Sequence, residues 1–183
     1  MKGRKVWLEQ LGELSSSLQL GELLLLHGRL FLMRDAAHKR LFPGDTKPDV
    51  TLDWNGKTIF YAGPAKPLPG WASGSIGPTT SLRMDPFLPA LLQAGACATM
   101  GKGLRGEQAR QACQRWNAVY LVAPSGCAAV LAQRIRKMQV VAFEELGPEA
   151  IFQAEVEDFP ALVAIDSQGH SLFNGIAAPQ CGS

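Results

Sequence analysis

The sequence has no long hydrophobic run and little net charge. Its most apolar stretch near the start, Leu18 to Leu26, is far shorter than the roughly 20 residues that a membrane-spanning helix needs. The formal net charge is only +2, and the basic residues are scattered, which argues against a nucleic-acid partner. No apolar segment with a small-residue cleavage site follows Lys2, Arg4 and Lys5. We therefore expect a cytoplasmic protein with no membrane span.

The four cysteines and three histidines give no metal-binding pattern. No two cysteines form a CxxC pair, and no histidine lies at metal-ligand spacing from a cysteine. We therefore expect this chain to bind no metal, and we expect the cysteines to be buried apolar residues rather than disulfides. Cys127 is the candidate for reactivity, because it lies in a glycine-rich turn before a predicted helix, where a thiol pKa can fall. The other three are Cys97, Cys113 and Cys181.

The chain of 183 residues, 46% of them hydrophobic, is long enough for one sizeable core. Residues 1–20 are interpreted as a lead-in segment and residues 21–183 as a single domain. In the second half, predicted strands alternate with predicted helices, namely strands 96–100, 119–123 and 140–143 and helices 107–116 and 126–138. This alternation indicates an α/β fold with a mixed, partly parallel sheet.

The first half and the C-terminal end are richer in predicted strands. These strands suggest a second, smaller sheet and cover residues 22–27, 30–33, 58–62, 162–165 and 171–173. Two short helices are also predicted, at residues 34–41 and from Asp85 to about Gln93. Asp35 is placed to cap the first of them, and Asp85 is placed as the N-cap of the second, with Pro86 at its first helical position.

Three cationic residues stand next to predicted strand ends or glycines. Arg34 follows a strand, Arg83 follows the long Gly/Pro/Ser/Thr-rich loop 63–80, and Lys102 lies between two glycines. In open α/β sheets, ligands gather beyond the carboxyl ends of strands. Two guanidinium groups and an ammonium would hold a compact dianion there. The residues by themselves thus predict an α/β domain with an anion pocket.

The same loop offers hydroxyl and backbone N–H groups, which suit an anion or a reacting oxygen. From Gly74 to Thr80 it runs Gly-Ser-Ile-Gly-Pro-Thr-Thr. It is not a phosphate-binding P-loop, because no Gly-Lys-Ser/Thr triplet closes it. A strand-end arginine is often a paired surface residue, and such a loop is more often a turn than a site, so a purely structural role stays open at this point.

Five strings of residues occur in a recognisable order: Arg34-Asp-Ala-Ala-His38, Tyr61-Ala-Gly-Pro64, Gly74-Ser-Ile-Gly-Pro-Thr-Thr-Ser-Leu-Arg-Met-Asp85, Gly101-Lys-Gly103 and Val156-Glu-Asp-Phe-Pro160. They resemble the class I fumarase and L-tartrate dehydratase family, and the likeness runs from about Gly21 to Phe173. The chain is similar to the C-terminal domain of that family, which in many bacteria is a separate β subunit.

The resemblance implies a swivelling β/β/α fold and the activity of an iron–sulfur-dependent hydro-lyase. Such an enzyme hydrates or dehydrates a C4 dicarboxylate, converting fumarate and malate or L-tartrate and oxaloacetate. The [4Fe–4S] cluster is expected on a partner α subunit, with none bound by this chain. An α2β2 assembly or a β-mediated dimer is expected from the same resemblance.

The resemblance also assigns the substrate-binding residues, which are Arg34, Arg83, Lys102, Thr80 and Gly77. Thr79 matches the family's proton-transfer residue, although a role as a plain hydrogen-bonding group to the substrate stays open. His38 lies four residues after Arg34 on a predicted helix, and it is expected to orient that arginine or simply to pack.

Two positions depart from the family pattern, where small residues are usual. Met33 precedes the first arginine and Leu82 precedes Arg83, and both would narrow the pocket. A methylated dicarboxylate such as mesaconate is therefore an alternative substrate. A second alternative is a non-catalytic module of the same fold that binds a dicarboxylate or serves in assembly.

Overall fold

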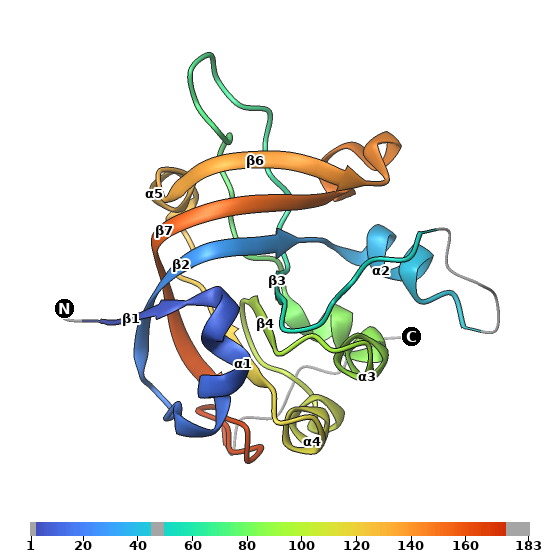
Figure 1. The fold of residues 1–183 in the computed structure, drawn as a ribbon, viewed down its shortest axis with the longest axis vertical. Coiled ribbons are helices and arrows are strands. Elements are labelled where there is room, and N and C mark those ends of the chain that lie inside the picture. Colours follow the sequence, from blue (N-terminus) through green and yellow to red (C-terminus); the bar gives the residue numbers. More distant parts are fainter. Residues whose placement is uncertain (1–2, 45–49, 175–183) are drawn as a thin grey trace.

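The computed structural model describes residues 3–44 and 50–174. Seven strands in these residues form one sheet in the order β1-β2-β3-β4-β5-β7-β6, and Figure 1 shows β2, β7 and β6 side by side. The strands are β1 Arg4–Trp7, β2 Leu23–Leu32, β3 Thr58–Phe60, β4 Ala98–Gly101, β5 Val119–Val122, β6 Ile135–Ala142 and β7 Ile151–Ile165. The α-helices are α1 Leu11–Leu14, α2 Asp35–Leu41, α3 Leu88–Gln93, α4 Glu107–Arg115 and α5 Ala128–Ala132. The 3₁₀ helices are η1 Leu8–Gln10, η2 Ser15–Ser17, η3 Ser81–Phe87 and η4 Glu144–Glu149.

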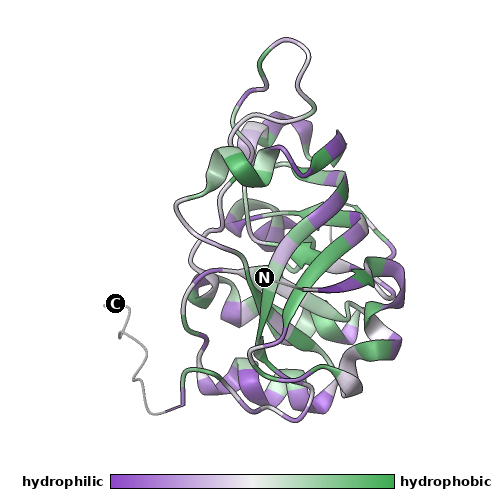
Figure 2. Cartoon of the chain, turned by 90° about the vertical axis from the view of Figure 1, so that its left-hand side faces the viewer, coloured by the Kyte–Doolittle hydropathy of each residue, from purple (hydrophilic) through white to green (hydrophobic). Residues whose placement is uncertain are grey.

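Five of the strands form a closed ring, in which each strand pairs with two others of the five. β2, β3, β4 and β5 run parallel to their neighbours, and the long strand β7 pairs antiparallel with both β5 and β2. The resulting ring encloses apolar side chains such as Leu24, Phe60 and Phe159, all of them buried. Figure 2 shows the hydrophobic residues concentrated on the central strands. The mixed, partly parallel sheet is confirmed, whereas the predicted second sheet is wrong, because all strands in the described residues belong to one sheet.

Closure of the ring explains most errors in the predicted elements. β2 is one continuous strand rather than two, and it passes through Gly28 with a bulge in its pairing to β7. Gly28 has φ +103°, and a Cβ there would lie 2.3 Å from a carboxylate oxygen of Glu9. The predicted helix 126–138 is wrong beyond its first turns, because residues 135–142 pair with β7 as strand β6.

The N-terminal residues lie against the ring. β1 pairs in parallel with β2, from Arg4 opposite Leu24 to Trp7 opposite His27. The side chains of Val6, Leu8 and Leu11 are buried in the same core cluster as the ring interior. No helix in residues 3–44 and 50–174 is long and apolar enough to cross a membrane.

Candidate active site

The register of the parallel strands places Arg34 and Lys102 at one end of the ring. Leu32 is paired with Phe60 across β2 and β3, and Phe60 is paired with Met100 across β3 and β4. Arg34 and Lys102 each come two residues after a member of this row. Both therefore emerge at the carboxyl ends of parallel strands, β2 and β4, which lie on either side of β3, and α/β folds bind ligands at such strand ends.

The glycine-rich loop returns to this end of the ring and inserts between the diverging ends of β3 and β4. The Thr79 N–H donates to the carbonyl oxygen of Tyr61 at 2.7 Å, and the Lys102 N–H donates to the carbonyl oxygen of Thr79 at 3.1 Å. The Ser81 N–H then donates to the carbonyl oxygen of Lys102 at 3.0 Å. Gly101 permits this close approach, because a Cβ there would lie 2.0 Å from the Ser81 hydroxyl oxygen. Thr79 is thus fixed by its backbone beside Lys102.

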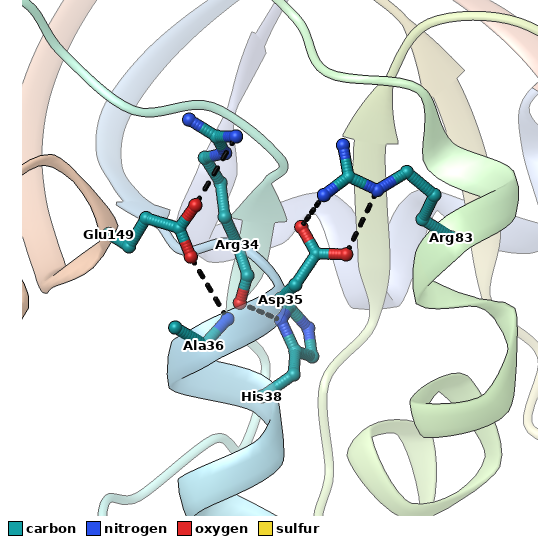
Figure 3. Close-up of polar contacts among 6 residues, drawn as sticks. All are labelled: Arg34, Asp35, Ala36, His38, Arg83 and Glu149. Carbon is teal, nitrogen blue, oxygen red and sulfur yellow. Dashed lines mark hydrogen bonds and ion pairs between the residues drawn. The ribbon is translucent and has the colours of Figure 1, made fainter.

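Both arginines lie at the N-terminal end of α2, each against a carboxylate (Figure 3). The Arg83 guanidinium donates to both oxygens of Asp35, Nε at 3.0 Å and Nη2 at 2.6 Å. Arg34 Nη2 lies 3.3 Å from Glu149, whose other oxygen accepts the Ala36 N–H at 3.1 Å. The predicted capping role of Asp35 is therefore wrong. Its carboxylate binds Arg83, and Glu149 from η4 accepts the first-turn N–H instead.

The side chain of Arg34 passes closely over Gly63. A Cβ at position 63 would lie 3.2 Å from Arg34 Nη1 and 2.5 Å from the carbonyl oxygen of Pro148. A larger residue there would displace the arginine. Among the described residues, the Nε of Arg34 is buried without a hydrogen-bond partner, which leaves one donor of this guanidinium unused by the protein.

His38 is fully buried directly beneath Arg34. Its Nδ1 lies 2.8 Å from the Arg34 carbonyl oxygen, and its ring packs against Tyr61 and Phe87. Burial lowers the pKa of His38 from 6.5 to about 4. The imidazole is therefore neutral at neutral pH, and its Nδ1 must carry the proton in order to donate to that carbonyl.

The other residues predicted to bind the substrate, Thr80, Lys102 and Gly77, lie in different places. The side chains of Thr80 and Lys102 are exposed, and within residues 3–44 and 50–174 the Lys102 ammonium makes no ion pair. Gly77 lies on the far side of the loop, toward α5, where a Cβ would be 3.6 Å from that of Ala128. The structure therefore places Arg34, Thr79, Thr80 and Lys102 at the strand ends, holds Arg83 against Asp35 next to Arg34, and leaves Gly77 at the base of the loop.

Sequence reasoning missed a buried ion pair below these residues. Arg105 Nε donates to Asp85, whose other oxygen accepts the Gly106 N–H at 2.6 Å. The predicted role of Asp85 as a helix N-cap is wrong, since Asp85 lies inside η3 and α3 begins only at Leu88. Arg105 lies close to glycines after a strand, the same signal that pointed to Lys102, and it could have been found on that ground.

The described cysteines lie apart from one another and from other ligand-type side chains. No three His, Cys, Asp or Glu side chains in residues 3–44 and 50–174 lie together as ligands would. Cys97 and Cys113 are buried, and burial raises the pKa of the Cys97 thiol and brings that of Cys113 to about 12. Cys127 is exposed, and Cys181 lies outside the described residues.

A closed mixed barrel that presents cations and hydroxyls at the carboxyl ends of its strands defines a domain suited to a small anion. The family model described as Fumarase C-terminus matches residues 2–176, so the chain belongs to this family. The resemblance inferred from the sequence strings is thereby confirmed.

Two groups of relatives share this similarity. The chain is 41% identical over 182 residues to the aerobic class I fumarate hydratase of Salmonella typhimurium, covering 96% of this chain and 30% of that protein. It is 39% identical over 166 residues to fumarate hydratase 2 of Leishmania major, covering 87% of this chain and 28% of that protein. It is 36% identical over 160 residues to the L(+)-tartrate dehydratase subunit beta of Escherichia coli, covering 85% of this chain and 79% of that protein. The chain thus spans less than a third of the length of these fumarate hydratases.

Proposed function

We propose that this chain is the β subunit of an iron–sulfur-dependent hydro-lyase that hydrates and dehydrates a C4 dicarboxylate, either fumarate and malate or L-tartrate and oxaloacetate. The observation that carries the proposal is that Arg34, Lys102 and Thr79 lie at the carboxyl ends of β2, β3 and β4, with Arg83 bound to Asp35 next to Arg34. Membership of a family whose relatives are fumarate hydratases and a tartrate dehydratase subunit supports it.

The cations match the charge that develops during the reaction. Removal of a proton next to a carboxylate moves negative charge onto that carboxylate in the transition state. Fixed guanidinium and ammonium groups stabilise this charge more than they stabilise the ground state, and this difference accelerates the reaction. Arg34 and Arg83 would bind the two carboxylates, and the exposed ammonium of Lys102 would add a third positive charge.

The carboxylates of Asp35 and Glu149 have a second role in this proposal. Each holds one arginine in place before the substrate arrives, and each leaves part of the guanidinium available. Arg83 uses Nε and Nη2 for Asp35, so its Nη1 remains for a substrate oxygen. Below them, neutral His38 orients Arg34 through its carbonyl oxygen.

Thr79 is the proposed proton-transfer residue. Its backbone is hydrogen-bonded on both sides, to Tyr61 and to Lys102, so its main chain is held beside Lys102. A threonine hydroxyl is a weak base unless a neighbour activates it, and that neighbour would belong to the partner subunit. Thr80 is proposed to bind the substrate directly, and Gly77, at the base of the loop beside Ala128, is proposed to contribute by shaping the loop.

We assign the [4Fe–4S] cluster to a partner α subunit, and the assignment is supported by a relative that is the beta subunit of a tartrate dehydratase, a name that implies a second subunit. Bound there, it would supply the Lewis acid for departure of the hydroxyl group. An α2β2 complex or a dimer formed through the β subunits is part of the same proposal.

The test is a substrate panel on the complex reconstituted with its cluster-bearing partner under anaerobic conditions. We expect hydratase activity on fumarate or dehydratase activity on L-tartrate, and we expect Arg83→Ala to lower kcat/KM by roughly 10²–10³-fold or more, as for removal of one group that stabilises a developing oxyanion. Because Arg83 is half exposed, the free energy of unfolding should change by less than about 1 kcal/mol. A wild-type complex that is inactive on fumarate, mesaconate and L-tartrate would contradict the proposal.

The mesaconate alternative rests on Leu82 alone. Met33, the other departure from the family pattern, is fully buried in the cluster under α2 and α3, so it fills the core. Leu82 remains partly exposed beside Arg83. Faster turnover of mesaconate than of fumarate, reversed in Leu82→Ala, would favour this substrate.

A non-catalytic module that binds a dicarboxylate or serves in assembly is the other candidate, and the departure from the family pattern at Leu82, beside Arg83, is the feature that favours it. This candidate predicts that the chain without its partner binds fumarate as tightly as the complex does. Calorimetric titration of each with fumarate separates the two functions.

A further inference from the structure

The segments that carry Arg83 and Lys102 are tied together below the surface. Asp85 lies two residues after Arg83 on η3, and Arg105 lies three residues after Lys102 on the loop before α4. The side chain of Arg105 is 0% exposed and that of Asp85 is 10% exposed. Arg105 donates to one oxygen of Asp85, and the Gly106 N–H donates to the other at 2.6 Å. One carboxylate therefore fixes the Lys102 loop to the Arg83 helix.

Arg105 is itself held on several sides. Its Nη1 donates to the Thr99 hydroxyl on β4 at 3.2 Å. Its guanidinium carbon lies 4.9 Å from the ring centroid of Tyr120 and 5.4 Å from that of Tyr61, within the range of cation–π attraction. The guanidinium is thus confined between η3, β4 and two aromatic rings.

Tyr120 on β5 makes a second tie between the same two segments. Its hydroxyl lies 2.9 Å from the Ser81 hydroxyl at the start of η3 and 3.0 Å from the carbonyl oxygen of Gly103, next to Lys102. Burial raises the pKa of this phenol to about 12, so the hydroxyl keeps its proton and both hydrogen bonds.

We propose that the Asp85–Arg105 pair, together with Tyr120, is the positioning element of the substrate site and sets the distance between Arg83 and Lys102. This inference rests on the proposed function, because it assigns the two cations to one ligand. None of the three residues would touch the substrate. They would act through the segments that they join.

A purely stabilising role explains the pair less well. Taking two charges out of water costs about as much as their attraction returns, and apolar residues of similar volume often stabilise a fold equally well or better. What apolar residues do not supply is a fixed, directional link between two loops. Misplacing a binding group by about 1 Å can lower the rate roughly 100-fold, so such a link has value at a site that grips two carboxylates.

The test compares two conservative variants in the reconstituted complex. Arg105→Lys keeps the charge but loses the planar fork that reaches both Asp85 and Thr99, and we expect kcat/KM for the dicarboxylate to fall by about 100-fold. Tyr120→Phe keeps the ring but loses both hydrogen bonds of the hydroxyl, and we expect a fall of about tenfold. Val163→Ala, a buried change on β7, is the control for lost stability, and its kcat/KM should stay within about twofold of wild type.

Amide hydrogen exchange of the full chain gives a readout that needs no activity. The Lys102 amide donates to the Thr79 carbonyl oxygen, and the Ser81 amide donates to the Lys102 carbonyl oxygen. Both amides should exchange at least tenfold faster in Arg105→Lys than in Val163→Ala. Unchanged exchange at these two amides, or a folded Arg105→Lys complex with wild-type kcat/KM, would overturn the positioning role. A wild-type complex that is inactive on every dicarboxylate would instead overturn the proposed function, and the exchange result would still decide whether the tie exists.

Discussion

Two aspartate–arginine pairs lie within one half of this molecule and differ in their exposure to water. In the upper pair, the side chain of Arg83 is 49% exposed and that of Asp35 is 18% exposed. In the lower pair, Arg105 is 0% exposed and Asp85 is 10% exposed. Each aspartate accepts two hydrogen bonds, but only the upper pair has substantial exposure to solvent.

The difference separates binding from positioning. An exposed pair contributes little to stability, since water and salt compete for both charges, so Arg83 can adjust its contact with Asp35 at small cost when its Nη1 binds the proposed substrate. A buried pair cannot lose one partner without leaving a charge in a poorly solvated place. The chain therefore places its more exposed charge pair at the proposed site and its buried charge pair below it.

The variant expected to have the largest effect on stability is Arg105→Met. It leaves the Asp85 carboxylate buried with only the Gly106 N–H, and we expect the free energy of unfolding to fall by about 3–5 kcal/mol. Urea unfolding measures the change. The double variant Asp85→Leu/Arg105→Met should recover part of the loss, because no unpaired charge remains. A loss below about 1 kcal/mol would mean that the buried pair behaves like an exposed one.

A second test uses the buried imidazole beneath the upper pair. Because the pKa of His38 is lowered to about 4 in the folded chain, the unfolded chain binds more protons between pH 6.5 and pH 4. The contribution of neutral His38 to the free energy of unfolding is therefore complete above pH 6.5. It is lost as the pH falls toward 4, and the loss is about 3 kcal/mol at most. His38→Asn keeps a donor for the Arg34 carbonyl but does not titrate in this range.

The measurement is the difference in free energy of unfolding between wild type and His38→Asn at pH 7 and at pH 4. Other titrating groups are common to both proteins and cancel in this difference. A difference that does not change with pH would show that His38 titrates normally in the folded chain.

The smallest expected effect belongs to the upper pair. Asp35→Asn removes the carboxylate from Arg83, and we expect the free energy of unfolding to fall by less than about 1 kcal/mol. Glu157→Gln is the matched control, since it breaks the exposed Arg136–Glu157 pair at 2.8 Å on β6 and β7. If Asp35→Asn alone lowered the free energy of unfolding by more than about 2 kcal/mol, the exposed pair would stabilise the fold as the buried pair does, and the proposed difference between them would be wrong.

Local patterns predicted the parts of the fold that are local. The strand 119–123, the helix 107–116 and the long irregular loop 63–80 were read from periodicity and from glycine and proline content, and the structure has them within a few residues. The misread helix 126–138 shows the limit. Residues 135–142 form a strand because β7 pairs with them, and the existence of that partner is not visible in a short window of sequence.

The candidate site divides in the same way. Arg34, Arg83 and Lys102 could be singled out because cations next to strand ends and glycines are a recognisable local signal. Their carboxylate partners could not be assigned. Glu149 approaches α2 from more than 100 residues away, and the Asp85-Pro86 pattern is typical of a helix N-cap, although its carboxylate binds Arg105, 20 residues further along the chain.

The pairing of β2 with β7 also constrains how the chain acquires its structure. Leu23 meets Leu162 and Leu32 meets Phe152, so the ring closes through contacts between residues 120 or more positions apart. Such distant pairings slow folding. During synthesis, β2 lacks its β7 partner until residues 151–165 have left the ribosome. We expect the nascent chain to be most prone to aggregation during this interval.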